Sequence, residues 1–336
     1  QEYGLTKKDK AYLDRMTMEL EILEELGFID YILLNWEVLN FCREKGIPTG
    51  PGRGSAAGSL VLFFLGVTKV DPIKYDLFFE RFVSRSRAKK IEGKDGVTYL
   101  DGSLLADVDN DIAYDRRAEV IEYIKKKYKG RTCKILNLVT LSGKLCIKEV
   151  GKLVALKEEE EMNDISDHIP VVFGKVAKLR DAVEESEVFA NWTLKNSKAF
   201  NVALKLEGLI KNTGVHASGI AISHHKLTDI CPIQKTKEGD LISCYDMNWI
   251  AELTVKFDIL GLKTLTVLND TKDLLKTTKG LDIKFEDIDL EDEFIYLNLQ
   301  ELQFKGGQGL FQIEADTNFD VCCKVKPRNL EEISAV

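Results

Sequence analysis

The sequence contains no pair of cysteines spaced C-x-x-C, and its seven cysteines are scattered along the chain. This pattern provides neither a zinc-binding pair nor a disulfide framework, so we expect reduced thiols in the cytoplasm. Long apolar runs are also missing: the strongest, residues 60–65, is far shorter than the ~20 residues that cross a bilayer. We therefore expect no membrane partner. The charged N-terminus does not resemble a signal peptide, and because it starts with Gln1 we expect a processed product or a segment of a longer protein.

Basic residues are in the minority, with 47 Lys and Arg against 55 Asp and Glu and a net charge of −8. This balance excludes a protein that is basic over its whole surface, but it leaves room for a local basic groove. With 336 residues, of which 44% are hydrophobic, the chain is long enough for two or three domains or subdomains.

The most informative stretch is acidic and covers residues 105–112, Leu-Ala-Asp-Val-Asp-Asn-Asp-Ile. In a strand, Asp107, Asp109 and Asp111 would point to one face, where like charges raise one another's pKa and a hard divalent cation relieves them. A calcium loop is excluded, since its sixth position would be Ile112 instead of Gly and its twelfth Ala118 instead of Glu. The residues alone leave metal-dependent phosphate chemistry and a solvated acidic turn open.

A glycine-rich turn at residues 46–55 is followed by a small-residue and apolar segment, 56–65, for which we expect a helix. Backbone N–H groups at such a turn suit a phosphate. There is no G-K-[ST], which excludes a Walker A loop. Residues 52–57 fit G-x-G-x-x-A, but Pro48 and Pro51 stand where a dinucleotide fold needs a buried strand. A structural turn without a ligand stays open.

Periodicity predicts helices over 9–45, 115–128, 157–212 and from 263 onward, strands over 134–140 and 254–260, and a hairpin or loop over 88–104. Lys256 and Asp258 would share one face of their strand, either as a structural ion pair or as a metal ligand beside a phosphate-neutralising cation. His216 alone reads as a structural histidine. Three lysines at four-residue spacing would line one helix face, and a charged stripe of this kind is usually a solvated face: Lys144, Lys148 and Lys152.

Taken together, these stretches resemble the alpha subunit of bacterial DNA polymerase III, the C-family replicative polymerases. The similarity rests on six motifs in the family's order, at residues 50–59, 71–82, 107–111, 216–219, 256–262 and 309–312. The departures are Ala106 in place of a proline, a longer stretch at 87–106 and an altered approach at 251–254. None of them removes a metal ligand.

The resemblance implies an α+β fold with a polymerase beta-like nucleotidyltransferase palm, in which helices flank a mixed sheet, a helical thumb and partial helical fingers. It places the palm at 1–138 and 214–263, the thumb at 139–213 and the beginning of the fingers at 264–336. We expect the family's phosphoesterase domain, most of its fingers, its clamp-binding region and its oligonucleotide-binding domain to lie outside these residues.

The implied function is template-directed DNA polymerisation, by nucleotidyl transfer from a dNTP to a primer 3′-hydroxyl with two Mg²⁺ ions. The implied partners are primer–template DNA, the remaining part of the polymerase and, through it, a sliding clamp, in the cytoplasm of a bacterium or a phage-infected cell. The alternative is a non-catalytic DNA-binding or assembly segment of a split polymerase. The implied site residues are Asp107, Asp109 and Asp258 for metals and catalysis, Arg53, Gly54, Ser55, Arg81 and Lys256 for the nucleotide, and Lys144, Lys148 and Lys152 for DNA.

Overall fold

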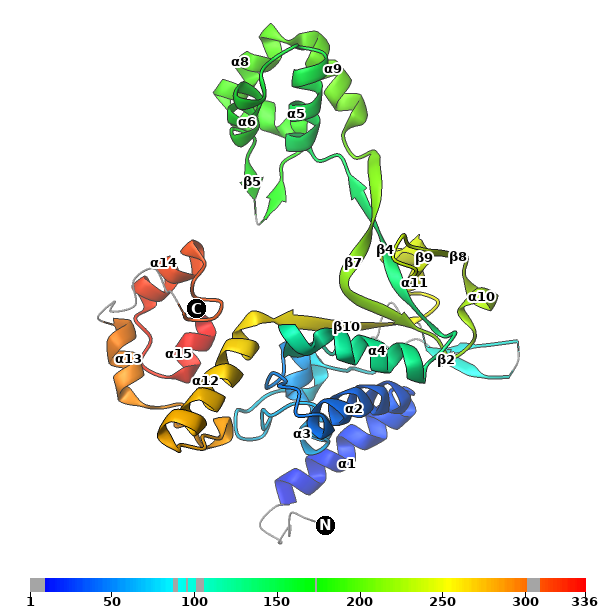
Figure 1. The fold of residues 1–336 in the computed structure, drawn as a ribbon, viewed down its shortest axis with the longest axis vertical. Coiled ribbons are helices and arrows are strands. Elements are labelled where there is room, and N and C mark those ends of the chain that lie inside the picture. The colour runs from blue at the N-terminus through cyan, green and yellow to red at the C-terminus, as the bar shows by residue number, and fades with distance from the viewer. Residues whose placement is uncertain (1–9, 87–89, 95, 101–105, 173, 301–308) are drawn as a thin grey trace.

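The computed structural model describes residues 10–86, 90–94, 96–100, 106–172, 174–300 and 309–336. At its centre is a six-stranded mixed sheet in the order β3-β10-β7-β4-β9-β8, with helices around it (Figure 1). This arrangement confirms the predicted α+β class. The strands are β3 (Asn110–Ala113), β4 (Thr132–Thr140), β7 (Ile210–Ile222), β8 (Ile233–Lys235), β9 (Leu241–Asp246) and β10 (Val255–Leu262).

Strand β10 joins two parts of the chain that are far apart in sequence. It runs parallel to β3, with Ile259 opposite Asn110, and antiparallel to β7, with Asp258 opposite Gly219. Strand β4 continues the sheet antiparallel to β7 and parallel to β9. Because β10 lies between β3 and β7, the acidic stretch near residue 110 and the glycine-rich stretch near residue 219 become its neighbours.

Each face of the sheet is covered by its own apolar cluster. On one face, Phe257 and Ile259 of β10 pack with Ile112 and with helices α2 (Ile29–Glu44) and α4 (Arg117–Lys127). On the other, β4 and Ala221 pack with the short helices α10 (Leu227–Ile230) and α11 (Met247–Ile250). Side chains alternate along a strand, so Asp258 points away from the face that α2 and α4 cover.

A separate cluster fixes the N-terminal helices and the glycine-rich turn. Helix α1 (Lys10–Glu25) and the first part of α2 pack against α3 (Leu60–Phe64) and the 3-10 helix η3 (Phe79–Arg81). The buried members include Leu23, Phe28, Leu62 and Phe79. A β-hairpin of β1 (Lys90–Glu92) and β2 (Thr98–Leu100) follows, which confirms the hairpin expected within 88–104.

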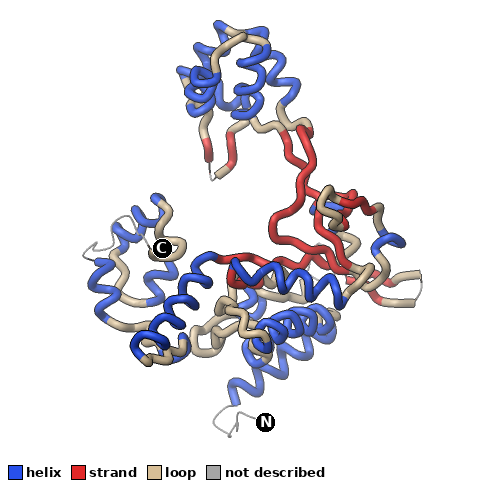
Figure 2. The backbone as a smooth tube through the Cα atoms, in the orientation of Figure 1, coloured by secondary structure: helices blue, strands red, loops and turns tan. Residues whose placement is uncertain are grey.

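A helical subdomain stands away from the sheet at the end of the two-stranded ribbon formed by β4 and β7 (Figures 1 and 2). It has its own buried cluster, which includes Ile147, Met162, Phe189 and Trp192. Its elements are α5 (Gly143–Leu153), α6 (Glu159–Asp167), α7 (Leu179–Glu185), α8 (Glu187–Lys195), α9 (Ser197–Leu206) and the small hairpin of β5 (Val171–Val172) and β6 (Lys175–Val176). Strand β7 begins at Ile210, before the expected return of the palm at residue 214, because Ile210 already pairs with Thr140.

After β10 the chain is helical, as the periodicity predicted. The elements are α12 (Lys263–Lys279), the 3-10 helix η6 (Phe285–Asp287), α13 (Glu293–Gln300), α14 (Asp316–Val325) and α15 (Leu330–Ala335). Tyr296, Leu299 and Cys322 form a small buried cluster between α13 and α14. No helix among the described residues is long and apolar enough to cross a membrane.

Two local predictions were wrong. The strand expected over 105–112 is formed only by Asn110–Ala113, and residue 105 lies outside the described residues. Before it, the N–H of Val108 donates to the Tyr31 hydroxyl (3.0 Å) and not to a neighbouring strand.

The helix expected over 56–65 is divided. The 3-10 helix η2 (Gly54–Gly58) comes first, then Ser59 in extended conformation, and then α3. A Cβ atom on Gly58 would lie 2.7 Å from the Phe78 carbonyl oxygen, so the chain is packed too tightly there for an ordinary helical residue. Ser59 ends the first segment and caps the second, because its hydroxyl accepts the Leu62 N–H (3.2 Å).

Candidate active site

Two buried carboxylates share one face of the sheet beside the β3–β10 pair. Ile112 and Ile259 point into the cluster under α2 and α4, so Asp111 and Asp258 point to the opposite side. Both residues are only 8% exposed. Each has one oxygen, Oδ1, that is buried without a hydrogen-bond partner among the described residues. Buried unpaired carboxylate oxygens are costly, and a cation is the ligand that would satisfy them.

Asp109 and Asp107 precede β3 and complete the acidic cluster. Burial raises the pKa of the Asp109 carboxyl above its ordinary value, and the charges of Asp258 and Asp107 raise it further. The same two charges act on Tyr31, whose pKa is raised to about 12 mainly by burial. Asp107 and Asp109 are two residues apart in sequence, whereas Asp258 comes 149 residues after Asp109 and its charge still acts on Asp109 and on Tyr31. Repulsion of this kind is what a bound divalent cation would relieve.

Two cations lie against the acidic cluster. Arg53 Nε is 3.3 Å from Asp111 Oδ2, and Lys256 Nζ is 2.8 Å from Asp258 Oδ2. The ion pair between Lys256 and Asp258 was one of the two interpretations of their shared strand face. Asp111 was part of the acidic motif but was not assigned to the metal set, and the structure gives it a partner, Arg53, that the sequence pattern did not indicate.

The glycine-rich turn is attached to the edge of the sheet beside the carboxylates. The Gly50 N–H donates to the Asp111 carbonyl (2.9 Å), and the Ala113 N–H donates to the Pro48 carbonyl (3.0 Å). A Cβ on Gly50 would lie 2.8 Å from the Cβ of Asp111, so only glycine allows this approach. Gly54 and Ser55 then open the 3-10 helix η2, with Gly54 in a left-handed conformation (φ +61°).

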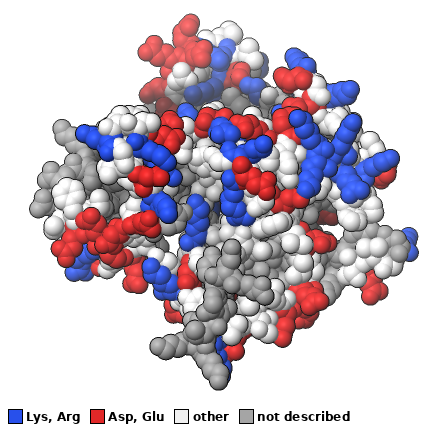
Figure 3. All heavy atoms as spheres, turned by 60° about the horizontal axis from the view of Figure 1, so that its bottom comes forward, with Lys and Arg blue, Asp and Glu red and all other residues white. Residues whose placement is uncertain are grey.

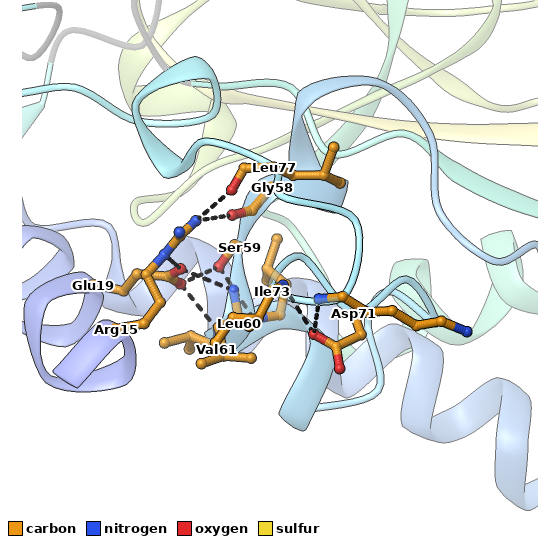
Figure 4. Close-up of polar contacts among 11 residues, drawn as sticks. Arg15, Glu19, Gly58, Ser59, Leu60, Val61, Asp71, Ile73 and Leu77 are labelled. Atoms are coloured by element: carbon orange, nitrogen blue, oxygen red, sulfur yellow. Dashed lines mark hydrogen bonds and ion pairs between the residues drawn. The ribbon is translucent and has the colours of Figure 1, made fainter. Parts of the chain in front are cut away.

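A buried ion pair that sequence reasoning missed holds the start of α3, the helix that follows this turn and η2 (Figure 4). Glu19 of α1 is fully buried, and its carboxylate accepts hydrogen bonds from the Ser59 hydroxyl (2.9 Å) and from the N–H groups of Leu60 (3.0 Å) and Val61 (3.1 Å). It thus occupies the N-terminus of α3, where a negative charge is favourable.

Arg15 completes the pair. Its guanidinium donates to Glu19 (2.7 Å) and to the carbonyls of Gly58 (2.8 Å) and Leu77 (3.0 Å). The only sequence signal was one Arg–Glu pair at i,i+4 in an amphipathic helix, which is normally a solvated pair.

Among the described residues, the other predicted site residues make no hydrogen bond or ion pair with these carboxylates. Arg81 is exposed at the end of η3. The α5 lysine stripe consists of Lys144, Lys148 and Lys152 and belongs to the helical subdomain. Lys144 is 3.5 Å from Asp167 and Lys152 is 3.9 Å from Glu159, whereas Lys148 has no acidic partner in the part of the chain that the structure describes. On the face in Figure 3, acidic and basic side chains are interspersed, in keeping with the net charge of −8.

The described residues do not contain three or more His, Cys, Asp or Glu side chains already arranged to hold a metal ion. The donor set nevertheless fits a hard cation, since it consists of carboxylate oxygens, two of which are buried without a partner. The metal-binding roles of Asp107, Asp109 and Asp258 therefore stay a prediction.

Comparison with known proteins places the whole chain in one family. The family described as the bacterial DNA polymerase III alpha NTPase domain matches residues 2–261, and the alpha subunit finger domain matches residues 264–336. The relatives are named DNA polymerase III subunit alpha. That of Aquifex aeolicus is 33% identical over all of this chain and 30% of its own length. Those of Thermus aquaticus and Campylobacter jejuni are 32% and 35% identical over 97% and 98% of this chain, and each is matched over 26% of its length. The chain thus spans less than a third of these relatives, and it belongs to the bacterial DNA polymerase III alpha subunit family.

Proposed function

We propose that this chain is the catalytic segment of a template-directed DNA polymerase, which transfers a nucleotidyl group from a dNTP to a primer 3′-hydroxyl. The observation that carries the proposal is a group of carboxylates beside a glycine-rich turn, in which Asp111 and Asp258 are buried on one face of the sheet and Asp107 and Asp109 directly precede β3. We assign the palm to residues 1–138 and 214–263, the thumb to 139–213 and the beginning of the fingers to 264–336. Family membership supports the polymerase proposal, because the relatives are named DNA polymerase III subunit alpha.

Asp107, Asp109 and Asp258 are the residues that would hold two Mg²⁺ ions, and the unpartnered oxygen of Asp111 adjoins this set. When bound, such ions lower the pKa of the attacking hydroxyl and neutralise charge on the phosphates. Arg53 forms an ion pair with Asp111 and Lys256 with Asp258, and these two side chains would be the cations that face a triphosphate held beside the carboxylates. Gly54 and Ser55 present backbone N–H groups and a hydroxyl at the turn, which suits phosphate oxygens.

The remaining residues hold nucleic acid without reading its sequence. Arg81 contributes a further cation near the nucleotide, and the α5 lysine stripe contacts backbone phosphates from the thumb. Base pairing with the template selects the incoming nucleotide. The rest of the polymerase supplies further fingers and, through its clamp-binding region, contact with a sliding clamp. We therefore expect the 336 residues alone to bind DNA weakly and extend primers poorly.

Primer extension with Mg²⁺ tests the proposal, using this chain with and without a second chain that carries the relatives' C-terminal part. Asp258→Asn should reduce extension on the order of a hundredfold or more, because charge stabilisation by a metal contributes several kcal/mol. The matched control is Asp270→Asn, which removes the same charge from an exposed position on α12. A Mn²⁺ titration of both variants gives a readout that does not depend on extension.

A non-catalytic assembly segment is the second candidate. It is favoured by the two ion pairs, Arg53 with Asp111 and Lys256 with Asp258, which already neutralise two of the carboxylates. If complementation restores no extension and neither Mn²⁺ nor primer–template DNA binds to the unaltered chain, the polymerase proposal fails and this candidate replaces it.

A further inference from the structure

Strand β7 contains a bulge directly beside the acidic cluster. Opposite β4, Val215 pairs with Leu136 and Ile220 pairs with Lys134. Four residues of β7, His216 to Gly219, therefore face the single residue Ile135. Bulges of this kind turn a side chain out of its regular direction and are frequent next to active sites.

Hydrogen bonds within the bulge fix the orientation of the His216 ring. Its Nδ1 accepts the Gly219 N–H (2.8 Å) and, at longer range, the Ser218 N–H (3.4 Å). Because Nδ1 is the acceptor, Nε2 carries the proton of the neutral ring. Among the described residues, Nε2 has no hydrogen-bond partner, so this N–H is a donor that the fold itself does not use.

The His216 ring lies on the same face of the sheet as Asp258. A Cβ on Gly219 would point to that face and would lie 3.0 Å from His216 Nδ1 and 3.3 Å from Asp258 Oδ1. The imidazole and the carboxylate thus flank one glycine, which is also the residue paired with Asp258 in the sheet. The carboxylate oxygen concerned is the buried one without a partner.

Arg117 holds the backbone on both sides of this arrangement. Its Nη2 donates to the carbonyl of Ala217 (2.6 Å) and its Nε to that of Ile259 (2.8 Å). These residues directly follow His216 and Asp258 in the sequence. One side chain therefore ties the bulge to β10 and fixes the imidazole relative to the carboxylate.

We propose that His216 is a substrate-contacting residue whose Nε2–H donates to a phosphate oxygen of the nucleic acid or nucleotide bound beside Asp258. This inference rests on the proposed function and adds a donor to it. Carboxylates repel phosphate, and a phosphate held next to them needs donors on the protein side. The oxygen belongs either to the primer backbone or to the triphosphate, and the two arms of the test distinguish these sources.

Two substitutions test the roles of the two ring nitrogens separately: Nδ1, which accepts hydrogen bonds within the bulge, and Nε2, which points out of it. His216→Asn places an amide oxygen near the position of Nδ1, so it keeps the acceptor of the bulge and loses the outward donor. His216→Gln places an amide N–H near the position of Nε2 and loses the inner acceptor. If His216 only shapes the bulge, His216→Asn should retain more substrate binding than His216→Gln. If His216 donates to substrate, His216→Gln should retain more substrate binding than His216→Asn.

The measurement is the affinity of the full chain for each probe in the presence of Mg²⁺ and of the second chain that carries the relatives' C-terminal part. The first arm titrates a primer–template duplex that ends in a 2′,3′-dideoxynucleotide, and the second adds the complementary dNTP to the saturated complex. We expect His216→Asn to weaken one arm about tenfold or more, the size of a lost hydrogen bond to a charged oxygen, and His216→Gln to stay within about threefold of the unaltered protein. A loss in the first arm identifies a primer phosphate, and a loss in the second alone identifies the triphosphate.

The inference would be overturned if both variants lost the same affinity, or if His216→Asn bound both probes as tightly as the unaltered protein. Either result would leave the proposed function intact. If the unaltered protein binds neither probe, the proposed function fails and the inference falls with it. Thermal unfolding of each variant checks the fold. Should His216→Asn unfold early, His216→Ala with added imidazole replaces it, and the inference then requires imidazole to restore the affinity.

Discussion

Glu19→Ala should destabilise the N-terminal cluster of α1, α2, α3 and η3 by about 3 kcal/mol. Breaking a buried ion pair costs about 3–5 kcal/mol, because the remaining charge is left without its partner. Here the lower end applies, since Arg15 is 20% exposed and keeps the Gly58 and Leu77 carbonyls as acceptors. Glu19→Gln keeps the volume and some of the hydrogen bonds, so its cost should be about 1–2 kcal/mol.

The tryptophans make it possible to measure this loss where it occurs. Trp36 packs against the N-terminal cluster, whereas Trp192 is buried in the cluster of the helical subdomain. In a chain with Trp36 as its only tryptophan, urea unfolding followed by fluorescence should show the full effect of Glu19→Ala. In the matched chain with only Trp192, the midpoint should not move. Separate reporters are needed because a protein with several subdomains does not unfold in two states.

A double-mutant cycle gives the sharpest check of the ion pair. Arg15→Met and Glu19→Met together should cost less than the sum of the two single substitutions, because no unpaired charge then remains buried. The reasoning is refuted if Glu19→Ala costs less than about 1 kcal/mol at the Trp36 reporter, or if both reporters shift equally.

Three further predictions concern charge and thiol chemistry. Because the pKa of Asp109 is raised in the folded state, the free energy of unfolding should fall as the pH rises from the ordinary Asp pKa through the raised one. Asp109→Asn should remove this fall and raise the melting temperature of the metal-free protein at pH 7. A variant with the same pH profile as the unaltered protein would contradict this prediction. Replacing the three lysines of the α5 stripe by glutamine should reduce the slope of log binding constant against log salt concentration for DNA. The expected reduction is about one unit for each DNA phosphate that the variant no longer neutralises. An unchanged slope would show that the stripe does not contact DNA phosphates. Iodoacetamide at pH 8 should label the exposed Cys244 first and leave Cys42 and Cys133 unmodified, since burial raises the pKa of both thiols to about 12; early labelling of either would contradict their burial.

Features set by local spacing were the ones that the sequence predicted well. The alternation around Phe257 placed Lys256 and Asp258 together on one face, and β10 has that arrangement. The four-residue repeat of the lysine stripe lies on one helix, α5, as expected. In both cases the period of the backbone fixes the outcome, so neighbouring residues contain all the information that is needed.

Features that depend on distant partners could not be read from the sequence. The alternation of aspartates at 107–111 predicted a strand, but the ladder covers only its end, because Val108 uses its N–H on Tyr31, 77 residues away. Glu19 looked like an ordinary helix residue, since nothing near it in sequence reveals that Ser59 lies against it. The bulge at 216–219 exists only because β4 and β7 pair in a particular register, which no pattern within β7 specifies.

The ribbon formed by β4 and β7 is, in topological terms, a β-hairpin whose turn has been replaced by the helical subdomain. At its far end the Leu141 N–H donates to the Leu209 carbonyl (2.8 Å), and the Gly208 N–H donates to the Leu141 carbonyl (2.9 Å). The two points where the domain is inserted are therefore already hydrogen-bonded to each other. A short Asn-Gly turn could close the strands directly, leaving the carboxylates, the bulge and the glycine-rich turn on an unbroken sheet. The helical subdomain is thus an insertion into a β-hairpin, and its length and composition can change without altering the sheet that carries the carboxylates.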